Sequence, residues 1–186
     1  MTTYRFSLNA TLLLFSAIAL LSTAPARAQL QGGDWELGFG VGATRFDTGS
    51  GEEDERRSEI RGGYFLTDRF EIEAQLSRAD ALFDATLDAA MVNAVFNFGP
   101  HGKAIPYVLA GVGGARIQDA PFFWEEGAEE VDEEGLAVQA GLGTRLFFGS
   151  SRVAARLEAS ILSEELLDER REHLSLTAGL LWRIGR

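Results

Sequence analysis

The stretch RVAARLEASIL (residues 152–162) sets an apolar face against a charged face. Val153, Leu157 and Ile161 fall on one parity, whereas Arg156 and Glu158 fall on the other. Successive side chains of a β-strand point to opposite sides, so the pattern predicts a strand with one apolar and one polar face. The stretch alone leaves open whether the apolar face points into a protein core or out into lipid.

The same two-residue period recurs in seven other segments, and no segment after residue 34 has a helical period. Turn residues or acidic stretches separate the segments, which favours consecutive antiparallel hairpins. The expected strands cover residues 35–45, 58–65, 70–79, 85–98, 105–117, 136–148, 152–162 and 173–185. We therefore predict an all-β protein, an eight-stranded antiparallel up-and-down barrel.

The first 28 residues have the pattern of a secretory signal peptide. Arg5 precedes the apolar run 10–21, and Ala26 and Ala28 form a small-x-small cleavage pattern before Gln29. We therefore expect a cleaved signal peptide over 1–28 and a barrel domain over 29–186. Removal of Arg5 and Arg27 leaves 15 basic and 28 acidic residues, a formal charge of −13, which argues against a nucleic-acid partner.

The polar faces of the expected strands are balanced in charge although the chain is strongly acidic. They carry five acids and five bases, namely Glu36, Glu59, Arg61, Glu71, Glu73, Arg116, Arg145, Arg156, Glu158 and Arg183. An unpaired buried charge costs several kcal/mol, so a confined interior favours such a balance. Glycines such as Gly143 and Gly179 share this face, as expected inside a narrow barrel. We predict that the charges form a network that plugs the lumen.

The apolar faces have the length and the aromatic ends of a membrane barrel. Each apolar stripe has five or six alternate positions, close to the roughly 9–11 residues with which a tilted strand crosses a bilayer. The aromatic residues expected to form an interfacial girdle are Trp35, Tyr64, Phe70, Phe96, Phe98, Tyr107, Phe148 and Trp182. We therefore predict a transmembrane barrel whose apolar face points outward.

The connections between strands alternate in length. Short turns are expected at 66–69, 99–104 and 149–151, whereas longer acidic connections are expected at 47–57, 118–134 and 163–171. The short connection 80–84 is an exception at the long-loop end. Short turns at one end and long acidic extracellular loops at the other are typical of the bacterial outer membrane, where we place the protein.

Three phrases carry a resemblance to a known family: MVNAVFNF (91–98), IPYVLAGVGG (105–114) and LTAGLLWRIG (176–185). With them, residues 29–186 resemble the small eight-stranded outer-membrane barrels of the OmpA transmembrane-domain and OmpX-like group. The resemblance implies insertion by the outer-membrane assembly machinery, which recognises the last strand. Such strands commonly end in an aromatic residue, whereas this sequence ends Trp182-Arg183-Ile184-Gly185-Arg186.

Residues suited to catalysis are scarce. The chain has two His and no Cys, and His101 lies in an expected turn. His173 and Ser175 resemble the His-x-Ser pair of outer-membrane lipid A deacylases, in which a nearby Glu orients the His. Here the pair opens the last expected strand, with no following strand to supply the acid, and both side chains are expected to face the lumen. We therefore predict a protein that is not an enzyme and has no cofactor; a deacylase-like enzyme and a soluble lipocalin-like carrier are the alternatives.

The connection 119–135 carries eight acidic residues without the fixed spacing of a calcium-binding loop. We expect it to be a solvated acidic loop, with Glu129, Glu130, Asp132 and Glu133 as weak candidate ligands for a divalent cation that bridges to lipopolysaccharide. The expected partners are outer-membrane lipid and lipopolysaccharide, the assembly machinery and an extracellular protein. The expected role of the barrel, as a monomer, is structural or in surface interaction.

Overall fold

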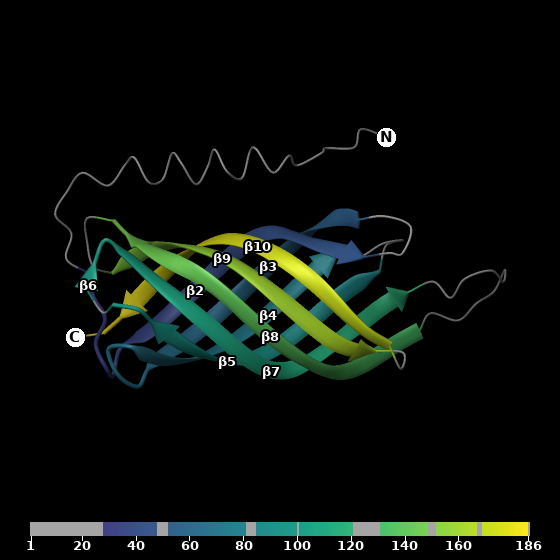
Figure 1. Cartoon of the computed structure of the whole chain (residues 1–186), viewed down its shortest axis with the longest axis horizontal. Helices are drawn as coiled ribbons and strands as arrows, with labels where there is room; N and C mark the ends of the chain where they lie inside the picture. The colour runs from purple at the N-terminus through teal and green to yellow at the C-terminus, as the bar shows by residue number, and fades with distance from the viewer. Residues whose placement is uncertain are drawn as a thin grey trace.

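The computed structural model describes residues 28–47, 52–80, 85–99, 101–120, 131–148, 152–166 and 169–185. Eight long strands close into one antiparallel barrel, in which β10 pairs with β2 to complete the wall (Figure 1). The strands are β2 (Trp35–Asp47), β3 (Glu52–Phe65), β4 (Phe70–Asp80), β5 (Thr86–Asn97), β7 (Ala104–Ala120), β8 (Val131–Phe147), β9 (Val153–Leu166) and β10 (Glu169–Ile184). The predicted fold and strand order are confirmed. Within these ranges, no helix is long and apolar enough to cross a bilayer.

The two ends of the barrel differ. At one end, called here the turn end, the turn 66–69 connects β3 to β4, and the two-residue strands β1 (Ala28–Gln29) and β6 (His101–Gly102) pair with each other. The C-terminus lies at this same end (Figure 1). The opposite end, called here the hairpin end, is where β2, β4, β7 and β9 finish. The sequence did not predict the β1–β6 pair, because two residues are too few to show a period.

The strands at the hairpin end are longer than predicted. Asp47 pairs with Glu52, and Leu166 pairs with Glu169, so two of the three expected long connections are mostly strand. β7 and β8 likewise extend to Ala120 and from Val131. The prediction of long loops over 47–57 and 163–171 is therefore wrong. Antiparallel backbone pairing continues there through acidic residues whose sequence has no apolar alternation.

The outer face of the barrel is apolar. Leu142 is 63% exposed, Leu180 is 60% exposed and Val112 is 60% exposed, although all three lie within strands. Ile161 on the opening stretch is 49% exposed. Leu157 differs. It lies on the outward side of β9, between the inward-pointing Arg156 and Glu158, but it is only 5% exposed. Large apolar side chains directed outward from a closed sheet fit a lipid solvent rather than water.

Most of the predicted girdle residues lie on the outer face near the turn end. Trp35 stacks against Tyr64 with ring centroids 4.8 Å apart, and Phe70 packs against Phe96 at 5.0 Å. Phe96 also meets Phe98 at 5.4 Å. Trp182 is 61% exposed and Phe148 is 37% exposed. These seven aromatic residues lie where a girdle at a membrane–water interface would lie.

The lumen is filled in layers. Near the turn end, an apolar cluster closes the barrel with Leu30, Phe65, Ile105, Phe147, Ala154 and Leu181. Buried charged side chains fill the middle. Toward the hairpin end a second apolar cluster contains Ala79, Leu87, Ala89, Met91, Ala115, Ala137 and Leu162. The charged middle therefore lies between an apolar layer at the turn end and a mixed layer at the hairpin end, where buried polar residues such as Arg57 and His173 share the lumen with the second cluster.

Candidate functional site

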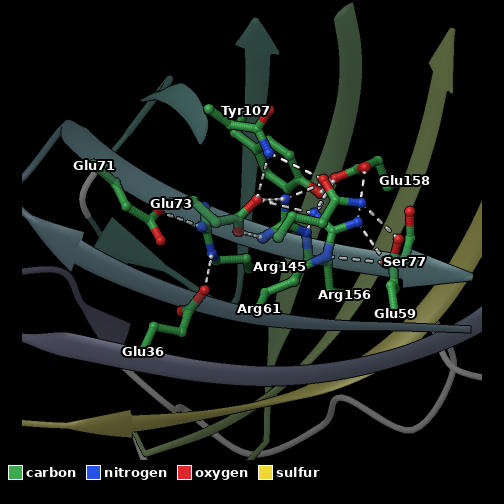
Figure 2. Close-up of polar contacts among 12 residues, drawn as sticks. Glu36, Glu59, Arg61, Glu71, Glu73, Ser77, Tyr107, Arg145, Arg156 and Glu158 are labelled. Atoms are coloured by element: carbon green, nitrogen blue, oxygen red, sulfur yellow. Dashed lines mark hydrogen bonds and ion pairs between the residues drawn. The ribbon is translucent and has the colours of Figure 1, made fainter. Parts of the chain in front are cut away.

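The centre of the lumen is organised around the Glu158 carboxylate on β9. Arg61 on β3 donates to Glu158 Oε1 at 3.0 Å, and Arg156 donates to Glu158 Oε2 at 2.7 Å. The Tyr107 hydroxyl on β7 donates to the same Oε2 at 2.8 Å. Figure 2 shows these side chains pointing toward one another inside the barrel from different strands. One carboxylate therefore ties three strands together.

Glu73 on β4 connects this centre to the other side of the barrel. It accepts from Arg61 Nη1 at 3.1 Å and forms an ion pair with Arg156. The Tyr107 ring lies beneath the Arg156 guanidinium at 4.6 Å and the Arg145 guanidinium at 4.8 Å. The cations are thus held by carboxylates at their edges and by an aromatic ring at their faces.

A second group of contacts surrounds Arg145 on β8, whose side chain is fully buried. Its Nε donates to Glu36 Oε1 at 3.2 Å, and its other nitrogens contact Glu71 and Asn97. Two carboxylates and an amide oxygen therefore satisfy one guanidinium. Each of these three charges has partners on other strands, which offsets the cost of burying it.

Glycines make room for these side chains. A Cβ at Gly143 would overlap the Tyr107 phenol, and a Cβ at Gly63 would overlap the Glu71 carboxylate. Both glycines point into the lumen at positions where a large polar side chain from a neighbouring strand needs their space. The glycines on the polar face of the sequence therefore have a packing reason, as expected of a narrow barrel.

Nine of the ten residues predicted for the lumen network lie in the lumen and are buried. They are Glu36, Glu59, Arg61, Glu71, Glu73, Arg145, Arg156, Glu158 and Arg183. Arg183 lies near the turn end, where its Nε is 3.6 Å from Asp34 Oδ2. The other eight are the charges of the two groups described above together with Glu59, whose Oε1 accepts from Arg61 Nε at 2.9 Å.

Arg116 does not belong to the lumen network. It lies on the outer face, is paired in register with Asp88 and Glu134, and its Nε is 3.7 Å from Glu134 Oε1. Tyr107 is also misplaced by the sequence prediction, because it is 1% exposed and points inward rather than into the girdle. Both errors come from segment 105–117, where Tyr107 and Leu109 on one parity and Val108 and Val112 on the other are apolar. When both faces of a strand are apolar, alternation does not show which face points into the lumen. In the structure, Tyr107 points inward because its hydroxyl binds Glu158 and its ring packs against two guanidinium groups.

Arg57 is a lumen residue that the sequence analysis missed. It is 4% exposed and donates to Ser175 Oγ and Ser77 Oγ, each at 3.1 Å. Its Nε lies 3.5 Å from Glu59 Oε2, which connects it to the central network. Arg57 fell in an expected loop, so no parity was assigned to it. Extending the alternation of β3 by one residue pair would have found it.

The predicted His-x-Ser pair does have an acid beside it. Glu164 Oε1 on β9 lies 2.9 Å from His173 Nε2, so the acid comes from the preceding strand, whereas the sequence analysis considered only a following one. The preceding strand supplies it because β9 extends to Leu166 and pairs with β10 there. As predicted, His173 and Ser175 point into the lumen, where they are 4% and 1% exposed. Ser175 Oγ is also within 2.9 Å of Thr44 Oγ1.

One group of carboxylates in the lumen has the spacing of a metal site. Oxygens of Glu36, Glu71 and Glu73 lie within 4.8 Å of one another. Arg145 and Arg156 already pair with these carboxylates, and their positive charge would repel a cation. Of the loop candidates, Glu129 and Glu130 lie outside the described residues, while Asp132 and Glu133 belong to the first residues of β8, whose side chains are not described.

A family model connects this architecture to known proteins. The model for the outer membrane protein beta-barrel domain matches residues 12–175. The chain belongs to this family. It is therefore an outer-membrane β-barrel protein. No curated protein matches the chain in sequence.

Solved structures of outer-membrane barrels share the fold. Neisserial surface protein A superposes with a TM-score of 0.67 at 13% identity, covering 81% of this chain and 98% of that one. The N-terminal barrel of Pseudomonas aeruginosa OprF gives 0.57 at 19% identity, covering 80% and 97%. Ail, the attachment invasion locus protein of Yersinia pestis, gives 0.57 at 15% identity, covering 83% and 100%. At these identities the likeness concerns the fold.

Proposed function

We propose that this outer-membrane barrel has a closed lumen and acts through its surface, as a structural or surface-interaction protein. The observation that carries the proposal is the interlocked network around Glu158, Arg61, Arg156 and Glu73, which spans the barrel interior from wall to wall. An eight-stranded barrel leaves room inside only for side chains. Here those side chains are charges paired with one another, and separating a buried pair costs about 3–5 kcal/mol.

The apolar clusters on either side of the network support the same proposal. Phe65, Phe147 and Leu30 are each at most 3% exposed near the turn end. A permeating ion would have to leave water, pass such residues and then separate charge pairs, and each step raises its free energy. The lumen is therefore better suited to stiffening the barrel than to conducting ions.

Planar bilayer recording tests the proposal. We expect the purified full chain, inserted in a lipid bilayer, to show no stable conductance at neutral pH. Arg156→Ala serves as the comparison, because it removes a network cation without adding bulk. Reproducible, ion-selective openings of the unmodified protein that Arg156→Ala alters would contradict a closed lumen.

A lipid-modifying enzyme is the second candidate, and the His173–Glu164 contact is the observation that favours it. A serine hydrolase needs a nucleophile beside a base that an acid orients. Against it, Ser175 is buried in the lumen, whereas an acylated lipid substrate would lie outside the wall. Incubation with purified lipid A, followed by measurement of released fatty acid, distinguishes the two. Release by the unmodified protein that Ser175→Ala abolishes would establish the enzyme.

The soluble-carrier alternative is excluded by the family and by the outward-facing apolar side chains.

The orientation, export and assembly of the protein are also part of the proposal, and they follow from its membrane topology. We place the turn end in the periplasm and the hairpin end outside the cell, in contact with lipopolysaccharide, divalent cations and an extracellular partner. Export with a cleaved signal peptide over 1–28, insertion by the assembly machinery and a monomeric state complete the proposal. Fractionation tests the location: release by osmotic shock without detergent would contradict it.

A further inference from the structure

A row of charged side chains crosses the outer face of the barrel. The backbone register places Arg78 on β4 beside Asp88 on β5, and Asp88 beside Arg116 on β7. Arg78 and Asp88 form a two-point ion pair, Nε to Oδ1 and Nη2 to Oδ2, each 2.7 Å long. Both side chains point away from the lumen, on the surface that otherwise carries apolar residues.

The position of Arg78 on its strand brings this charge close to the hydrocarbon region. On β4 the outward residues run from Phe70 through Leu76 to Arg78, whereas on β8 the apolar run continues from Phe148 to Leu136. A tilted strand rises about 2.5 Å per residue along the membrane normal, so Arg78 lies about 20 Å above Phe70. A typical apolar band is about 25 Å tall. The charged pair therefore lies at the edge of the outer leaflet on this side.

A groove on the same face has the Arg78–Asp88 pair in its lining, together with Arg116 and Glu134. It has a volume of about 830 Å³, and its lining includes Phe39, Ile60, Leu76, Ala90 and Gly114. These residues form one cross-strand row, because Phe39, Ile60, Leu76, Ala90 and Gly114 are successive register partners. Ala90 and Gly114 leave room at one end of this row, whereas Phe39, Ile60 and Leu76 carry larger side chains. The apolar row of the groove fits an acyl chain, and its charged edge fits a headgroup.

We infer that this groove, with Arg78 at its edge, binds a phosphate-bearing lipid of the outer leaflet; the leaflet rests on the orientation proposed above, in which the hairpin end faces out of the cell. The acyl chain lies over Ala90 and Gly114, and the phosphate meets the Arg78 guanidinium. Asp88 accepts from Nε and Nη2 of Arg78, so the phosphate would accept from the third guanidinium nitrogen, Nη1. The Arg78 side chain is 62% exposed and the Asp88 side chain only 31%, so the cation is the partner that faces the bilayer. Phosphate and guanidinium form strong, charge-assisted hydrogen bonds.

Native mass spectrometry of the full chain in detergent tests the headgroup contact. Dioleoyl phosphatidic acid is the probe, and dioleoyl phosphatidylcholine, whose phosphate is a shielded diester, is the comparison lipid. The double variant Arg78→Gln/Asp88→Asn keeps both side chains polar and removes both charges of the pair together. We expect its affinity for phosphatidic acid to fall about tenfold or more, the effect of losing a charge-assisted hydrogen bond.

Arg56→Gln is the matched control, because Arg56 is also exposed on the outer face of β3 but lies outside the groove. We expect this control to change affinity less than twofold. Equal binding by the double variant and the unmodified protein, or an equal loss in Arg56→Gln, would overturn the site. The heat-dependent gel shift of the folded barrel confirms that each variant is folded.

Filling the groove tests the acyl-chain contact separately. We expect Ala90→Leu to weaken binding of dioleoyl phosphatidic acid severalfold while leaving short-chain dihexanoyl phosphatidic acid nearly unchanged. Ala110→Leu, an exposed alanine of β7 outside the groove, is the control. Indistinguishable results for the two variants would overturn the inference, as would a protein dimer that only Ala90→Leu disrupts. None of these outcomes depends on whether the lumen conducts, so the closed-lumen proposal is tested independently.

Discussion

The inner and outer faces of the barrel wall are built from the same strands but have opposite chemistry. On β8, Arg145 points inward and is fully buried, while Leu142, three residues away, points outward and is 63% exposed. The inner face depends on particular partners, because each buried charge needs its counterion. The outer face depends on position along the membrane normal, because lipid accepts any apolar side chain and rejects charge by depth. Substitutions on the inner face should therefore be partner-specific, and those on the outer face depth-specific.

The largest effect is expected on the inner face. Arg145→Met leaves the carboxylates of Glu36 and Glu71 buried without their guanidinium. We expect the free energy of unfolding to fall by about 3–5 kcal/mol, the cost of breaking a buried ion pair. Urea titration in phospholipid vesicles, followed by tryptophan fluorescence, measures the change.

A second variant tests whether the loss of stability comes from the unpaired carboxylates. The triple variant Arg145→Met/Glu36→Gln/Glu71→Gln removes the stranded charges, and we expect it to recover most of the lost stability. If the triple variant is as unstable as Arg145→Met alone, packing of the Arg145 side chain rather than its charge holds the network.

A charge on the outer face should cost less, and the cost should depend on depth. Leu142 lies midway along the outward residues of β8, so Leu142→Arg places a cation near the bilayer midplane. We expect a loss of about 2–4 kcal/mol in the same unfolding assay. Leu66→Arg is the control, because Leu66 is 54% exposed but lies in the turn 66–69. Equal losses at the two sites would mean that the outer face does not meet lipid.

Glycine substitutions compare the two faces with the smallest chemical change. In Gly143→Ala, the new methyl group meets the Tyr107 phenol and the Leu157 carbonyl, and we expect a loss of about 1–3 kcal/mol. In Gly62→Ala, the methyl group meets only a Leu37 side-chain carbon at 3.7 Å. The second variant should be as stable as the unmodified protein. A similar loss in both would show that the strands, not the crowded lumen, require glycine.

The smallest effect is expected in the girdle. Trp35 and Tyr64 stack at 4.8 Å, and such aromatic pairs contribute about 0.5–1.5 kcal/mol beyond the area they bury. A double-mutant cycle with Trp35→Leu and Tyr64→Leu should give a coupling energy in this range. A coupling of zero would indicate that each ring meets only lipid headgroups, as generic outer-face positions would.

The sequence predicts the fold well because two chemistries alternate strictly along most strands. On β4, Phe70, Ile72 and Leu76 alternate with Glu71 and Glu73, so each face is identified by its own residues. Segment 105–117 lacks this contrast, and there the inward Tyr107 and the outward Arg116 were both assigned to the wrong face. Side-chain partners decided the orientation, and those partners come from other strands.

The sequence also failed to predict how far the strands extend at the hairpin end. Arg57 and Glu164 lie where acidic and basic residues replace the apolar alternation, so both were placed in loops. Backbone pairing does not need apolar side chains, and the register simply continues through them. The Glu164–His173 contact therefore cannot be predicted when each strand is considered by itself. Tracing each hairpin outward from its last apolar pair would recover such contacts.

The burial of Leu30 at the turn end has a consequence for the order in which the barrel folds. Its side chain is 1% exposed in a pocket that includes Phe65 of β3, Ile105 of β7 and Leu181 of β10. Because strands from both ends of the sequence line this pocket, it exists only after β10 has paired with β2. We expect the insertion of Leu30 to be among the last native contacts to form, which makes it a reporter of barrel closure. A fluorescent or cross-linking probe at this position would distinguish an assembled barrel from an open sheet.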